Sequence, residues 1–335
     1  MKYLTFGEIM LRLKAPGKER FFQSASLEAT FGGSEANVAA SLSSFGLDAG
    51  FLTVLPQGAL GDACAAELRR AGVDTGRILR GPGRMGIYFV EQGANLLGGR
   101  VVYDRENSAM SLAGPGTVDW TAALRDAGWL HISGITPAIS ASAAALSMEA
   151  VQAAKARGLT VSCDVNYRKN LWKYGKSAPQ VMRELVKSVD VLVAAEDDIA
   201  EGLGMPGDPS LPEGERYRRI TDQVLAEYPD LRLVAAVTRD MVSSDWYEWR
   251  AYLNNRRDFL TSKEYEIRDV VDPIGGGDAF AAGLLYGLGR YGSGPEALEF
   301  AAAAGCLKYS FFGDFSRASV SDVERVVRGE GGLSR

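Results

Sequence analysis

The feature that most limits the fold is an alternation of strand-like and helix-like runs that starts at Trp129. Strands are predicted over "WLHIS", "LTVSCD", "DVLVAA" and "LRLVAAV", and helices near 142–157 and 178–187 separate the first three of them. This order is typical of a parallel sheet that is covered by helices on both faces. The sequence therefore predicts an α/β fold with a central, mostly parallel sheet.

The N-terminal part extends the same pattern. Strands are predicted at 3–6 and 51–54, with helices near 34–45 and 61–71, and we assign these strands to the same sheet. A second stretch of hairpin strands is expected between 243 and 267. Neither an internal repeat nor a low-complexity linker is visible, so one domain over 1–335 is predicted.

Two segments interrupt the alternation, at about 11–30 and 85–111. In the second, "MGIYFVEQ" and "RVVYDREN" look like alternating strands without a helix between them. We interpret both segments as a small antiparallel sheet that forms a lid on the main domain.

Composition excludes several classes of partner. The net charge is −5 and no basic cluster occurs, which argues against nucleic acid and anionic membranes and favours a small molecule. Glu8 and Arg12 interrupt the first apolar stretch, and no run is long enough to cross a bilayer. Three widely spaced cysteines give no disulfide framework, so a cytoplasmic protein is expected. A single histidine, His131, makes a multi-histidine metal site and a Ser-His-Asp hydrolase improbable.

Three glycines, Gly275, Gly276 and Gly277, precede Asp278 where a strand pattern changes to a helix pattern. Backbone N–H groups at a helix N-terminus attract anions, and glycine lets an anion approach closely. The same letters also fit a turn in which Asp278 caps the helix, so the motif alone leaves both interpretations open. A dinucleotide fingerprint is excluded, because it requires glycine where Phe280 stands.

Other polar residues occur where a ligand could be bound. Gly33 and Asn37 begin the helix in "FGGSEANVAA", which is either a second ligand loop or a capped glycine turn. In the lid, Tyr88, Tyr103 and Arg105 suit a carboxylate with hydroxyls, or are solvated strand residues.

The predicted strand "LTVSCD" ends at Asp164, and Asn166 and Arg168 follow it. Ligands of α/β sheets bind at this carboxyl edge, so Arg168 is a candidate for holding an anionic group. Alternatively, Arg168 pairs with Asp164 and only fastens the loop.

Taken together, "DPIGGGDAFAAG" and "FGGSEANVA" resemble the C-terminal and N-terminal signatures of the ribokinase-like (PfkB) carbohydrate kinases. Within that family the chain is most similar to 2-keto-3-deoxygluconate kinases, through "FGEIMLRL", "GIYFVEQGA", "VVYDRENSA", "HISGITPA", "DVNYRKNLW" and "GDF". The resemblance implies a three-layer α/β/α ribokinase-like domain with a β-sheet lid. It also implies transfer of phosphate from ATP, with Mg²⁺, to the C6 hydroxyl of 2-keto-3-deoxygluconate.

The resemblance further implies roles for single residues. Asp278 is the expected general base, and the backbone of 275–277 is the expected anion hole. The expected sugar-acid contacts are Gly33, Asn37, Tyr88, Tyr103, Arg105, Asn166, Arg168 and Asp314. The expected nucleotide contacts are Glu196, which is also the candidate metal residue, Thr238 and Arg239.

The chain departs from the family pattern in two places. The usual Asn-x-x-Glu metal motif begins here with Ala195, and the nucleotide strand continues as "AAVTRDMVSSDW" without a glycine turn. Two alternatives therefore stay open: a kinase for another sugar, such as fructose or ribose, and a weakly active member that binds a sugar acid. A dimer formed through the lid is expected by analogy, and the gluconate or galactonate epimer is left undecided.

Overall fold

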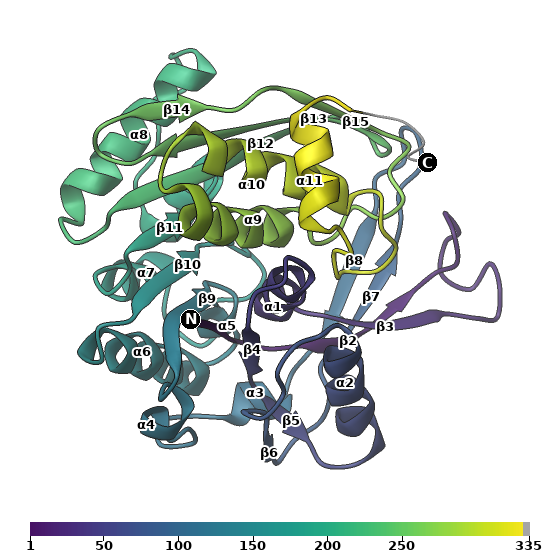
Figure 1. Ribbon diagram of the computed structural model, residues 1–335. Coiled ribbons are helices and arrows are strands. Elements are labelled where there is room, and N and C mark those ends of the chain that lie inside the picture. The colour runs from purple at the N-terminus through teal and green to yellow at the C-terminus, as the bar shows by residue number, and fades with distance from the viewer. Residues whose placement is uncertain (331–335) are drawn as a thin grey trace.

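Nine strands form the central sheet of the computed structural model, which describes residues 1–330 (Figure 1). Within that range the strand order is β14-β13-β12-β11-β10-β9-β1-β4, and β15 also pairs with β13. The strands from β12 to β4 run parallel, whereas β13, β14 and β15 add an antiparallel edge. Their bounds are β1 (Lys2–Phe6), β4 (Ala49–Leu52), β9 (Ala127–Ser133), β10 (Thr160–Asp164), β11 (Val191–Val193), β12 (Leu233–Ser243), β13 (Trp246–Asn254), β14 (Phe259–Thr261) and β15 (Tyr265–Arg268).

Helices cover both faces of this sheet, so the predicted three-layer α/β/α architecture is confirmed (Figure 1). One face carries α3 (Ala109–Leu112), α4 (Trp120–Ala123), α6 (Ala141–Ala156), α7 (Ala178–Val186) and α8 (Glu213–Glu227). The other carries α1 (Ser34–Ser44), α9 (Gly276–Tyr291), α10 (Pro295–Lys308) and α11 (Val320–Val327). The remaining helices are α2 (Ala59–Arg70), α5 (Thr136–Ile139) and the π-helical turn η1 (Asp198–Gly202).

Strand β11 shows why the buried strands read as continuous apolar runs. Leu192 packs into the cluster on the α6 face, whereas Val191 and Val193 pack into the cluster on the α9 face. Successive side chains of a strand point to opposite faces, and here both faces are covered, so every position of the strand is apolar.

A second sheet has the order β3-β2-β7-β8 and forms the lid. Its strands are β2 (Met10–Lys14), β3 (Glu28–Gly32), β7 (Ile87–Glu91) and β8 (Arg100–Asp104). The prediction of an entirely antiparallel lid was wrong, because β2 and β7 pair in parallel. Both strands leave the main domain in the same direction, and β3 and β8 bring the chain back as their antiparallel partners.

Two local predictions also needed adjustment. The strand expected at 51–54 is divided between β4 and β5 (Val54–Pro56), and β5 pairs with β6 (Leu79–Gly81) in a separate two-stranded sheet. The helix expected just past Asp278 begins earlier, at Gly276, so that two glycines lie within its first turn. In the part of the chain that is described, none of the helices has the length and apolarity needed to cross a bilayer.

Candidate active site

A cleft of about 880 Å³ lies where the carboxyl ends of the parallel strands face the lid. All the residues that the sequence predicted for a site line this cleft. They are Gly33, Asn37, Tyr88, Tyr103, Arg105, Asn166, Arg168, Glu196, Thr238, Arg239, Gly275, Gly276, Gly277, Asp278 and Asp314. The fold therefore brings together segments that are far apart in the sequence, although their individual roles stay predictions.

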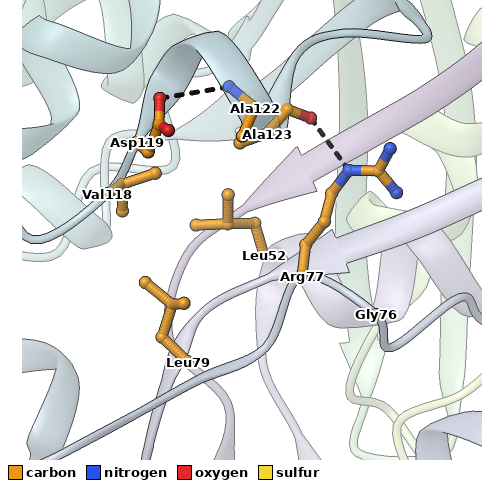
Figure 2. Close-up of a pocket in the computed structure, with 8 residues that line it drawn as sticks. All are labelled: Leu52, Gly76, Arg77, Leu79, Val118, Asp119, Ala122 and Ala123. Atoms are coloured by element: carbon orange, nitrogen blue, oxygen red, sulfur yellow. Dashed lines mark hydrogen bonds between the residues drawn. The ribbon is translucent and has the colours of Figure 1, made fainter.

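A smaller cavity of about 400 Å³ lies beside α4 and is largely apolar (Figure 2). Leu52, Leu79 and Val118 point into it. Its arginine, Arg77, is already paired, because Nε donates to the carbonyl of Ala123 and the two terminal nitrogens bind aspartates. None of the residues predicted for a site lines this cavity, so the larger cleft is the candidate active site.

Asp278 lies in the first turn of α9, and its carboxylate is held by two donors from α1. Ser34 Oγ donates to Oδ1 over 2.6 Å, and Asn37 Nδ2 donates to Oδ2 over 2.7 Å. Burial raises the pKa of Asp278, whereas these two hydrogen bonds and the charge of Arg168 lower it. The carboxylate is thus fixed in direction and is a suitable proton acceptor.

Asn37 was expected to bind a hydroxyl of the sugar, but its amide is engaged within the protein. Its Nδ2 holds Asp278, and its Oδ1 accepts a hydrogen bond from the N–H of Gly33 over 3.3 Å. Gly33 itself is required by a close approach, because a Cβ there would lie 2.1 Å from the carbonyl oxygen of Glu8. In this state the second glycine loop positions the candidate base.

The glycine run adopts the geometry that an anion site needs. Gly275 has φ 92°, in the left-handed region, and a Cβ there would lie 2.5 Å from the carbonyl oxygen of Asp314. A Cβ on Gly277 would meet no atom within 4 Å. The N–H groups of the first turn of α9 have no intrahelical acceptors and lie at the positive end of the helix dipole. They are therefore available to a phosphate in the cleft.

A buried ionic network joins the lid to the glycine run. Arg12, only 1% exposed, donates to Asp314 Oδ1 and to Asp272 Oδ2, each over 2.7 Å. Tyr88 donates its hydroxyl to Asp314 Oδ2 over 2.5 Å. Two of the predicted sugar contacts, Tyr88 and Asp314, therefore bind each other while facing the cleft.

The lid also supplies a paired arginine and an exposed tyrosine. Arg105 donates through Nε to Glu8 Oε2 over 2.8 Å, and Ser108 donates to the other oxygen of Glu8. Tyr103 is 46% exposed and stacks on Tyr88 with a centroid separation of 6.0 Å. The ion pair with Glu8 was not foreseen from the sequence.

Two acidic side chains, Asp164 and Asp198, lie at or after the carboxyl ends of β10 and β11. Asp164 accepts the N–H of Asn166, and Asp198 accepts the N–H groups of Tyr167 and Ala195. Burial is the main cause that raises the pKa of each carboxyl group; the charge of Asp198 also raises the pKa of Asp164, and the charge of Asp197 raises that of Asp198. Asn166 holds a left-handed backbone with φ 40°, and its amide donates to Ser34 Oγ over 3.4 Å.

Arg168 lines the same part of the cleft. Among residues 1–330, its guanidinium has no hydrogen bond or ion pair. Arg168 forms no ion pair with Asp164 within this range, although its charge lowers the pKa of Asp164. An anionic group of a ligand can reach this guanidinium directly.

The residues predicted to bind the nucleotide also line the cleft. Glu196 Oε2 accepts Arg216 Nε over 2.7 Å, so its carboxylate is already paired. Arg239 donates to the hydroxyl of Tyr309 over 3.2 Å and lies over the ring of Tyr247 at 5.3 Å. Thr238 is on the same strand, β12, and also faces the cleft. No group of three or more His, Cys, Asp or Glu side chains within 1–330 forms a ready metal site.

Comparison with known proteins agrees with the geometry. The model of the pfkB family of carbohydrate kinases matches residues 2–314. The chain is 35% identical to the 2-dehydro-3-deoxygalactonokinase of Haloferax volcanii over 99% of this chain and 98% of that protein. It is 27% identical to the 2-dehydro-3-deoxygluconokinase of Bacillus subtilis over 93% of this chain and 90% of that protein.

A solved structure of a similarly named kinase has the same fold as this chain. The crystal structure of 2-dehydro-3-deoxygluconokinase from Thermotoga maritima is 42% identical and superposes with a TM-score of 0.93. That alignment covers 98% of this chain and 100% of the other. The resemblance noted from the glycine motifs is confirmed, and the chain belongs to the pfkB family of carbohydrate kinases.

Proposed function

We propose that this kinase transfers the γ-phosphate of ATP to the C6 hydroxyl of 2-keto-3-deoxygluconate. The observation that carries the proposal is the placement of Asp278. Asp278 lies in the first turn of α9, whose glycines expose their N–H groups to the cleft, and Ser34 and Asn37 of α1 hold its carboxylate in place. A base and an anion site that share one turn suit the transfer of a phosphoryl group to a hydroxyl.

The chemical step follows from this placement. Asp278 accepts the proton of the C6 hydroxyl while that oxygen forms a bond to the γ-phosphorus. The bond between the γ-phosphorus and the bridging oxygen breaks, and ADP leaves with the electron pair. The N–H groups of 275–277 stabilise the charge on the equatorial oxygens during transfer. Asp278 then loses its proton to solvent, which restores the carboxylate.

The sugar end of the cleft is suited to an acid. The guanidinium of Arg168 makes no hydrogen bond or ion pair among residues 1–330, and a guanidinium binds a carboxylate through two parallel hydrogen bonds. Tyr103 and Arg105 line the lid side of the same space. A neutral sugar of the fructose or ribose type would leave Arg168 unpaired, so this alternative is less favoured.

The chain also has residues that fit a magnesium ion. Asp164 is buried, Asp198 is half-buried, and both carboxyl groups face the cleft near Arg168, whose charge lowers the pKa of each. A bound cation would add positive charge there. We therefore assign the metal to Asp164 and Asp198, because the carboxylate of Glu196 is paired with Arg216. When bound with ATP, Mg²⁺ supplies positive charge to the phosphate oxygens. Arg239 and Thr238 are placed to contact the nucleotide.

One assay tests this proposal. Release of ADP from MgATP is measured with 2-keto-3-deoxygluconate, its C4 epimer, and the neutral sugars fructose and ribose. We expect turnover with a 2-keto-3-deoxy sugar acid, at a kcat/KM far above that for either neutral sugar. Turnover with the neutral sugars alone would overturn the assignment of the substrate. Binding of a sugar acid without any turnover would instead indicate the weakly active alternative.

We also propose that the chain forms a dimer through its lid. Strand β8 is the edge of the lid sheet, and all five of its residues are exposed. Among them, Val101, Val102 and Tyr103 are between 41% and 46% exposed. An open edge strand with exposed apolar side chains is unfavourable in an isolated monomer and suits pairing with a second copy.

A further inference from the structure

A lysine without a role in the proposed chemistry is buried next to the candidate active site. Lys308 is the last residue of α10 and has no exposed surface. Its ammonium has three donors, and among residues 1–330 the acceptor for one of them is the carbonyl of Phe311, at 3.1 Å. Lysine is rarely buried completely unless it is paired, so this position calls for a physical explanation.

The side chain of Lys308 packs directly behind the glycine run. A Cβ on Gly275 would lie 3.2 Å from Lys308 Cε. The next residue, Tyr309, packs as closely, because a Cβ on Gly276 would lie 2.6 Å from its ring. The left-handed turn at Gly275 therefore packs directly against the end of α10.

The two helices meet with opposite dipole ends. The N-terminus of α9, at Gly276, lies beside the C-terminus of α10, and a Cβ on Gly305 would lie 3.2 Å from the carbonyl oxygen of Gly276. A helix C-terminus carries a partial negative charge that would weaken the attraction of the α9 N-terminus for phosphate. An ammonium at Lys308 neutralises that end.

Several charged groups act on the buried ammonium of Lys308. Burial lowers the pKa of Lys308, whereas Asp272, Asp314 and Asp278 raise it and Arg12 lowers it. Arg12 already binds Asp272 and Asp314. Three anions, Asp272, Asp314 and Asp278, thus face the two cations Arg12 and Lys308, so the loss of the Lys308 charge would make the surroundings of the anion site more negative.

We propose that Lys308 is a positioning residue for phosphoryl transfer. It holds the turn at Gly275 in shape and offsets the negative charge of the aspartates behind the anion hole. It acts through the N–H groups of 275–277 rather than by touching the substrate. This inference rests on the proposed function.

The test compares variants that separate charge from shape. Lys308→Gln keeps a donor for the Phe311 carbonyl but loses the charge, and Lys308→Arg keeps the charge. Lys14→Gln is the matched control, because Lys14 is 2% exposed but lies in the lid strand β2. We measure kcat, KM, thermal unfolding, and the affinities for ADP alone and for ADP with aluminium fluoride, a mimic of the transferring phosphoryl group.

We expect Lys308→Gln to lower kcat and the affinity for the ADP–aluminium fluoride complex by at least ~10-fold, since a lost anion-hole interaction weakens binding of the transferring group most. Affinity for ADP alone should change less than threefold, and Lys308→Arg should recover most of the loss. Equal losses for ADP and its fluoride complex, or wild-type kcat in Lys308→Gln, would overturn the proposal. If the wild type shows no turnover with the sugar acid but binds the ADP–aluminium fluoride complex more tightly than Lys308→Gln does, the result counts against the proposed substrate and not against the role of Lys308.

The pH profile gives a second measurement that does not depend on folding of the uncharged variant. The kcat of the wild type should fall on the alkaline side as Lys308 loses its proton, at a pH below the ordinary lysine value of 10.5. Lys308→Arg should lack this decline, because arginine stays charged. An identical alkaline limb in the two proteins would contradict the role of the charge.

Discussion

Asp278 shows at the scale of one residue how a buried carboxylate can remain ionised. Burial disfavours its charge, and the hydroxyl of Ser34 and the amide of Asn37 offset that cost by donating to separate oxygens. The same donors leave the carboxylate only one direction in which to point. In the proposed mechanism the base therefore depends on two neighbours from another helix as well as on the acid itself.

Asn37→Leu tests this dependence. Removal of the Nδ2 donor takes away a contact that lowers the pKa of Asp278, so that pKa rises. Because the base must be ionised, we expect the acidic limb of the profile of kcat/KM against pH to move to higher pH. Ser41→Ala, one turn later in α1, is the control and should leave the limb in place. If the acidic limb stays in place in Asn37→Leu, the hydrogen bond from Asn37 does not control the pKa of Asp278.

Arg12 illustrates what the sequence could not disclose about single residues. It was noticed only as a charge inside an apolar stretch, yet it binds Asp272 and Asp314, which are 260 and 302 residues away in the chain. Pairing over such separations is decided by the packing of the lid and the helices, and no local pattern encodes it.

At the scale of elements, the start of α9 was predicted to within one turn because its signal is local. A strand pattern, a glycine run and an apolar stripe follow one another, and the helix begins at Gly276. The parallel pairing of β2 with β7 was not predicted, since alternation within a strand does not specify the direction of its neighbour. The direction of β2 and β7 relative to each other is determined by how each strand is connected to the main domain.

Gly275→Ala tests the geometry of this helix start. A left-handed alanine costs about 1–2 kcal/mol, and its Cβ would also lie 2.5 Å from the carbonyl oxygen of Asp314. Gly292→Ala is the matched control at the other end of α9, because Gly292 has φ 77° and an added Cβ meets no atom within 4 Å. We expect both variants to lose stability in urea unfolding, but only Gly275→Ala to lose most of its kcat. Equal kcat values would refute the special role of Gly275.

Helix α1 is fastened to the sheet by a carboxyl group that makes stability depend on pH. Glu35 is fully buried, and Ser133 and Thr136 donate to its Oε1. Burial raises the pKa of Glu35 from 4.5 to about 7, although these hydrogen bonds lower it. Between those pH values the folded state binds a proton that the unfolded state has released, so this group stabilises at low pH and the contribution is lost as pH rises.

Glu35→Gln should remove that dependence. Relative to the wild type, the free energy of unfolding of the variant should rise between pH 4.5 and 7, by at most about 3 kcal/mol from 1.36 kcal/mol per pKa unit. Urea unfolding of both proteins across this range measures the difference, in which the titration of all other groups cancels. Parallel curves would show that Glu35 does not titrate there.

At the scale of the whole molecule, the layered fold was predictable because both faces of the sheet are covered and the strands are apolar throughout. The location of the cleft followed from that fold, since residues after parallel strands gather at one edge. The lid's contribution did not follow, because its hydrogen bonds to the main domain, such as that from Tyr88 to Asp314, depend on how the two sheets meet.

The proposed dimer is tested at the same scale. Val102→Lys places a charge on the exposed edge strand β8, which should disfavour pairing with a second copy. We expect light scattering after size-exclusion chromatography to show a dimer for the wild type and a monomer for the variant. Leu60→Lys, on the exposed side of α2, is the control and should stay dimeric. A monomeric wild type at micromolar concentration would contradict the proposal.

The most direct measurement of the central claim is the turnover of 2-keto-3-deoxygluconate by Asp278→Asn, with binding of the sugar acid measured on the same protein. Asparagine preserves the shape of the side chain but cannot accept the proton. We predict that kcat falls by ~10²- to 10⁴-fold, the usual contribution of a general base, while the dissociation constant for the sugar acid changes little. Turnover at the wild-type rate in Asp278→Asn would contradict the account.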